Sequence, residues 1–207
     1  MLVFRCLTTA LAFAFLGPTG PALANESVYT DLNLDRCQTI AADEMGALMK
    51  CKGYKDYPIY FAEGDLRQSV LYGPVRAELI EGAFESFEPF NHINTKVEWR
   101  LDASGKPFAA ILRWFIENIG ETGMPTKEAE GQVLVISRVA QPQDGLSCVV
   151  GYVDALSNSS ANELARQVAD SDARDFACGV QEGMWIGKRG EKTSEQTHVW
   201  PEGLSGE

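Results

Sequence analysis

Four cysteines follow an N-terminal segment typical of an export signal, and this combination constrains the fold more than any other feature. Residues 1–24 contain one base, Arg5, then an apolar run (Leu7–Leu16), and they end in the small-x-small pattern of Ala22–Ala24. We therefore expect cleavage before Asn25 and a periplasmic or secreted mature chain. In an oxidising compartment, four cysteines more often form two disulfides than a metal site.

Spacing favours one pairing of these cysteines. The segment between Cys37 and Cys51 has a turn-like centre and predicts a β-hairpin in which both cysteines are equally distant from Glu44. Opposite residues on antiparallel strands have Cα atoms about 4.5 to 5.5 Å apart, which suits a disulfide. The remaining pair is then Cys148 with Cys178. A zinc site would require closely spaced Cys or His pairs, which the sequence lacks, so we expect neither a metal nor a cofactor.

The charge balance narrows the class of partner. Removing residues 1–24 removes one base and no acid, so 17 basic and 29 acidic residues remain and the net charge is −12. Such a surface repels nucleic acid and anionic lipid, and the apolar run is too short to span a bilayer. We expect no nucleic-acid partner and no membrane insertion, which leaves an unknown protein or small ligand. The composition predicts one domain over 25–186 and a polar, flexible tail over 187–207.

Period-2 alternation predicts most of the chain to be β-structure. Residues 28–35 alternate in this way, and 119–131 have the composition of a mobile loop. Apolar β-rich runs separated by turn residues predict three hairpins, which join 57–62 to 68–72, 97–101 to 108–115, and 132–139 to 147–153.

Two segments have helical rather than strand periodicity. Ser160 and Glu163 form a capping-box pattern, and an apolar stripe behind them predicts a helix over 160–171. We predict an α+β fold: a mainly antiparallel β-sheet built from hairpins, with this C-terminal helix packed on it. Residues 78–88 also have one apolar helical face, but Gly82 makes that helix marginal, so 76–92 is predicted either as a helix or as an extended loop.

Motifs that indicate catalysis are missing. The mature chain has two histidines, His92 and His198, and it lacks the Gly-x-Ser-x-Gly and nucleotide-binding glycine motifs. Residues 31–35 resemble the start of a calcium loop, but Arg36 and Ala42 occupy the positions that need glycine and glutamate. We therefore predict no catalytic, cofactor-binding or metal-binding residue.

One acidic and aromatic stretch remains as a possible recognition surface, formed by Glu78, Glu81, Glu85, Phe87, Phe90 and His92. The acids are more typical of the solvated face of a helix, and the rings are more typical of side chains that cover a sheet edge. The favoured hypothesis is a non-catalytic binding protein. The alternative is a carboxylate-dependent hydrolase of envelope glycans, whose first acids to test are Asp65, Glu78, Glu81 and Glu85.

Three segments resemble a group of exported, disulfide-containing proteobacterial proteins of uncharacterised activity. They are Val97–Leu101, Tyr152–Ala155 and Ala161–Arg166. The resemblance spans most of the mature chain and implies a Gram-negative periplasmic setting. Its motifs are structural ones, so it adds no catalytic residue.

Overall fold

The computed structural model describes residues 25–204, so the predicted signal peptide lies outside the described residues. The elements in chain order are β1 (Glu26–Asp31), the 3-10 helix η1 (Leu34–Arg36), β2 (Gln38–Ala42), β3 (Gly46–Tyr54), β4 (Tyr57–Gly64), β5 (Arg67–Tyr72), α1 (Ala77–Gly82), β6 (Phe84–Phe87), β7 (Asn91–Leu101), β8 (Pro107–Ile116), β9 (Gly131–Arg138), β10 (Val149–Asp154), α2 (Ala161–Asp172), β11 (Met184–Ile186) and β12 (Gln196–Val199).

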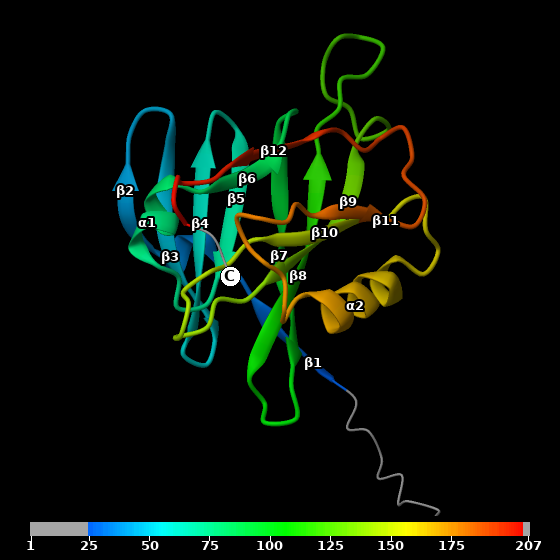
Figure 1. The fold of residues 1–207 in the computed structure, drawn as a ribbon. Coiled ribbons are helices and arrows are strands. Elements are labelled where there is room, and N and C mark those ends of the chain that lie inside the picture. The colour runs from blue at the N-terminus through cyan, green and yellow to red at the C-terminus, as the bar shows by residue number, and fades with distance from the viewer. Residues whose placement is uncertain (1–24, 205–207) are drawn as a thin grey trace, which may run out of the picture.

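Most strands belong to two antiparallel sheets (Figure 1). The larger sheet has the order β1-β7-β8-β9-β10-β11, and only its β10–β11 pair is parallel. The smaller sheet has the order β2-β3-β4-β5, and a separate ribbon pairs β6 with β12. The predicted β-rich fold with few helices is confirmed, as are the three predicted hairpins.

The main core lies between the two large sheets. Apolar side chains of β3, β4 and β5 share one buried cluster with those of β7, β8, β9 and β10. Trp99 of β7 is fully buried at its centre, and the ring of Tyr72 meets it edge-on at 5.6 Å between centroids. Alternation explains this core, because every second residue of a strand points to the same face.

A second cluster involves α2. The helix contributes small buried side chains at Ala161, Ala165 and Ala169, which share the cluster with residues of β8, β9 and β10. The predicted helix is present, but its capping box is not formed. Ser160 makes no side-chain hydrogen bond at the helix start. The Glu163 carboxylate does not bond back to Ser160 but lies near Arg166, with 3.7 Å between its Oε2 and a terminal guanidinium nitrogen.

Both predicted disulfides are present. Cys37 and Cys51 have Cα atoms 4.4 Å apart at the open end of the β2–β3 hairpin. Cys148 and Cys178 have Cα atoms 5.7 Å apart and join the start of β10 to the chain that follows α2.

Two segments differ from the sequence-based description. Helix α1 ends at Gly82, and the residues that continued its apolar pattern form strand β6. The region predicted to be a flexible tail contains β12, which pairs with β6 in the register Gln196↔Phe87 to Val199↔Phe84. Each strand supplies the other's hydrogen-bond partner, so neither is evident from its own local sequence.

Candidate functional site

The six residues of the predicted recognition surface do not form one surface. Glu85 and Phe87 are 6% and 1% exposed. The Phe87 ring packs edge-on against Trp114 and Tyr152, at 5.7 Å from each. These two side chains are therefore core residues, which corrects their assignment to a recognition surface.

The other four candidates are accessible but occupy different environments. The guanidinium of Arg67 lies over the Phe90 ring at 5.2 Å. His92 stacks on Phe115 and places its Nδ1 3.0 Å from a carboxylate oxygen of Glu117. Glu78 and Glu81 are exposed on α1.

The four acids proposed for a hydrolase also lie in different environments and do not share one site. Asp65 forms an exposed ion pair with Arg67 at 2.6 Å. Glu85 is buried and bonded within the core, as described next, and Glu78 is exposed outside the groove described below. Only Glu81 lines a groove together with other carboxylates.

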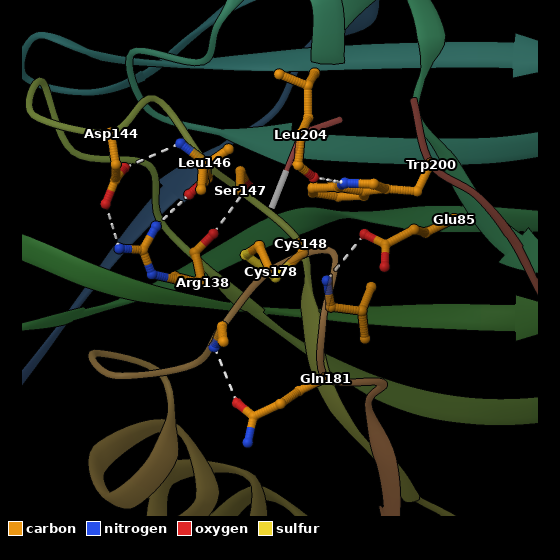
Figure 2. The surroundings of a disulfide bond; sticks show 12 residues. Glu85, Arg138, Asp144, Leu146, Ser147, Cys148, Cys178, Gln181, Trp200 and Leu204 are labelled. Atoms are coloured by element: carbon orange, nitrogen blue, oxygen red, sulfur yellow. Dashed lines mark hydrogen bonds and ion pairs between the residues drawn. A yellow bond between two sulfur atoms is a disulfide. The ribbon is translucent and has the colours of Figure 1, made fainter. Parts of the chain in front are cut away.

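Glu85 is the centre of a buried polar group near the Cys148–Cys178 disulfide (Figure 2). Its Oε2 accepts a hydrogen bond from the Val149 backbone N–H at 2.9 Å, and its Oε1 lies 3.2 Å from Nδ1 of His198 in β12. The His198 ring stacks on Trp200, whose indole N–H donates to the Leu204 carbonyl. The last described residues are thus held against the core by both polar and aromatic contacts.

The hydrogen bond with Glu85 raises the pKa of His198, although partial burial opposes the shift. The folded-state pKa therefore lies above the unfolded-state value of about 6.5. The charged pair stabilises the fold fully below that unfolded-state value, and its contribution is lost as the pH rises through the folded-state pKa.

We expect His198→Gln to lower the free energy of unfolding more at pH 5.5 than at pH 8.5. Urea denaturation of both proteins at the two pH values measures this difference. The control repeats the comparison in a Glu85→Gln background, where the pH-dependent part should vanish. If His198→Gln causes the same loss at both pH values in the protein that retains Glu85, the charged pair is contradicted.

A groove lies on the outer face of the smaller sheet, between the tip of the β2–β3 hairpin and α1. It has a volume of about 480 Å³. Ala41, Leu48 and Ala62 line it from three adjacent strands, and Ile80 and Phe84 line it from α1 and β6. Helix α1 covers only part of this sheet face, so these small and apolar side chains remain accessible.

Strands β3 and β4 approach each other closely at the hairpin end of the groove. Gly46 pairs with Gly64 across β3 and β4. A Cβ atom at Gly46 would lie 1.8 Å from the Glu63 carbonyl oxygen, so this position requires glycine. Asp43 fixes the hairpin turn by accepting hydrogen bonds from the backbone N–H groups of Met45 and Gly46.

The charges around the groove have one sign. Among residues 25–204, its lining includes Asp43, Glu63 and Glu81 but no Lys, Arg or His. Met45, at the hairpin tip, is 64% exposed. The groove therefore combines apolar walls with three carboxylates. The sequence did not predict this groove. Its only local indications are the alternating pattern around Leu48 and the helical position of Glu81, and both residues line the groove.

The resolved carboxyl pKa shifts do not indicate a general acid. A hydrogen bond from Ser104 lowers the pKa of Asp102. Burial alone would raise the pKa of Asp144 and Asp154, but hydrogen bonds more than offset it and lower both. A general acid needs a pKa raised towards the working pH. Across residues 25–204, no group of three or more His, Cys, Asp or Glu side chains is arranged to hold a metal ion.

No family model, curated protein or solved structure matches this chain. In the described part of the chain, no helix has the length and apolar character needed to cross a membrane.

Proposed function

We propose that this protein is a non-catalytic, exported binding protein whose groove takes an extended peptide segment with apolar and basic side chains. The observation that carries the proposal is the lining of the groove, which in the described part of the chain joins apolar walls to three carboxylates and includes no base. Apolar side chains of a ligand would gain from burial against Leu48, Ile80 and Phe84. Its basic side chains would pair with the carboxylates at the groove rim.

Charge and dimensions support this class of ligand over others. The mature chain carries a net charge of −12, which attracts cationic partners and accelerates their association. Its volume of about 480 Å³ lies within the roughly 300 to 1,000 Å³ typical of ligand sites. Accessible apolar surface beside polar residues is typical of interaction sites.

The alternative remains a carboxylate-dependent hydrolase of envelope glycans. Its support is that Glu81 shares the groove with Glu63 and Asp43. However, Asp43 is committed to the hairpin turn, and Glu63 accepts a hydrogen bond from Gln68 at 2.8 Å. We therefore favour binding over hydrolysis.

We also propose a periplasmic or secreted setting, as the resemblance to exported proteobacterial proteins implies. The two disulfides support an oxidising compartment. We also propose that α2 packs on the larger sheet and shields that face from solvent. The groove then lies on the smaller sheet, which α2 does not cover. The shared buried cluster of α2 with β8, β9 and β10 supports this arrangement.

The groove is tested by titrating the protein with a fluorescein-labelled peptide of alternating leucine and lysine. Fluorescence anisotropy should show saturable binding, and Glu81→Lys should weaken it about tenfold or more, because a like charge replaces an attractive one. Glu78→Lys is the matched control: it makes the same charge change on the same helix but outside the groove lining.

Two results would reject the groove as the binding site. One is equal affinity of the Glu81→Lys and Glu78→Lys variants for the leucine-lysine peptide. The other is equal binding of a peptide in which glutamate replaces every lysine. Release of reducing sugar from envelope glycans by the wild type, but not by Glu81→Gln, would instead favour the hydrolase.

A further inference from the structure

We propose that the protein has a second binding site, for a small oxyanion such as phosphate or sulfate, at the C-terminal end of α2. A cavity of about 150 Å³ lies there between the β7–β8 turn, the end of β9 and the residues that follow α2. Its charged lining residues are Lys106, Arg138, Arg174 and Asp102. This site is separate from the groove and does not depend on the function proposed for it.

Arg138 presents a buried donor that has no acceptor. Its two terminal nitrogens donate to the Leu146 carbonyl and to a carboxylate oxygen of Asp144, and Figure 2 shows both bonds. Its Nε is also buried but has no hydrogen-bond partner in the described part of the chain. Because this Nε is shielded from solvent, Arg138 contributes its positive charge to the cavity that it lines rather than a hydrogen bond from Nε.

The other two cations of the cavity keep their charges available. Within residues 25–204, neither Lys106 nor Arg174 forms a salt bridge. The Arg174 guanidinium lies 3.4 Å from the centroid of the Phe108 ring and donates to the Asn25 side-chain oxygen at 2.9 Å. These contacts orient the guanidinium without neutralising it.

The two nearby carboxylates do not cancel this positive charge. Asp144 forms an ion pair with Arg138 through a terminal nitrogen of the guanidinium group. Asp102 lines the cavity, but its Oδ1 already accepts hydrogen bonds from the Ser104 hydroxyl and the Lys106 backbone N–H. Three bases against two acids leave a positive excess, in a chain whose net charge is strongly negative.

Cavity size and charge define the ligand. A volume of about 150 Å³ is well above the roughly 10 to 15 Å³ that one water needs on the same measure, so a small oxyanion has room there. Guanidinium groups present planar donors that match phosphate oxygens. The acidic surface elsewhere repels large polyanions and anionic membranes, so we commit to a free small oxyanion.

Isothermal titration calorimetry with inorganic phosphate, in chloride buffer at constant ionic strength, tests the site. The wild type should show saturable binding of one phosphate per chain. Lys106→Gln and Arg174→Gln should each weaken it about tenfold or more. Arg138→Gln removes the third positive charge of the cavity lining, so it should also weaken binding. Lys188→Gln, which removes an exposed base outside the cavity lining, should leave the affinity unchanged.

Far-UV circular dichroism and melting curves must show that each variant is folded before its affinity is compared. Absence of saturable heat with the wild type would overturn the proposal. Equal affinity of the wild type, Lys106→Gln and Arg174→Gln would also overturn it. A second arm sediments the protein with phosphatidylglycerol vesicles and with phosphatidylcholine vesicles. Binding to the former without binding of free phosphate would refute the choice of a free ion and identify a lipid headgroup instead.

Discussion

Replacing both Cys148 and Cys178 by alanine is expected to lower the free energy of unfolding by about 3 to 4 kcal/mol. The two cysteines are 30 residues apart. In the chain-entropy model, a cross-link across a loop of this length lowers the conformational entropy of the unfolded chain, which stabilises the folded state by about 3 to 4 kcal/mol. Both residues are buried, and their bond holds the start of β10 to the chain after α2. Urea denaturation of the oxidised wild type and of the double variant measures the difference.

The Cys37→Ala, Cys51→Ala variant serves as the comparison. Its loop spans 14 residues, so the same model predicts a smaller loss of about 3 kcal/mol. A loss below about 1 kcal/mol for the Cys148 and Cys178 variant would show that the bond does not stabilise the native state as this model requires.

The second large effect is expected from Ala165→Asp in α2. Ala165 is fully buried among residues of β8, β9 and β10, and a carboxylate there would have no partner and no water. We expect a loss of about 3 to 5 kcal/mol in the free energy of unfolding, or a failure to fold. Gln167→Asp introduces the same charge at an exposed position of the same helix and should cost less than about 1 kcal/mol.

Melting curves of the two variants decide whether α2 packs on the sheet. Similar melting temperatures would contradict that packing. If Ala165→Asp is not recovered as folded protein, Ala165→Ser is the milder variant to compare with the wild type, because it adds one small polar atom at the same position.

Local sequence was sufficient to predict the hairpins. In β4 with β5 and in β7 with β8, the partners follow one another along the chain, so alternation and turn residues determine both strands together. The Cys37–Cys51 bond was predictable for the same reason, because it closes a hairpin whose turn lies between the two cysteines.

Long-range pairing was not predictable in this way. Strand β1 pairs with β7, and β6 pairs with β12, yet no local pattern identifies either partner. The stretch after Gly82 kept a helical apolar period, but pairing with β12 gives Phe84–Phe87 a strand conformation. Tertiary hydrogen bonding therefore overrode the local pattern.

The same cause explains the misplaced site residues. Glu85 was assigned to a surface because it lies in an acidic and aromatic stretch, and carboxylates are rarely buried unless they are paired. Its burial is possible because the Val149 N–H and the His198 ring reach it from distant parts of the chain. The groove was missed because its walls come from a hairpin and a helix that meet only in the folded protein.

The pairing of β6 with β12 also sets an order of events during biosynthesis. Phe87 receives its partner only when Gln196 has been made. At about 5 to 20 residues per second, the ribosome needs roughly 5 to 20 seconds to cover that interval. During this time the residues of β6 lack the strand that pairs with them in the folded protein. A chain truncated before residue 196 would leave this strand unpaired, and unpaired strand edges are prone to aggregation.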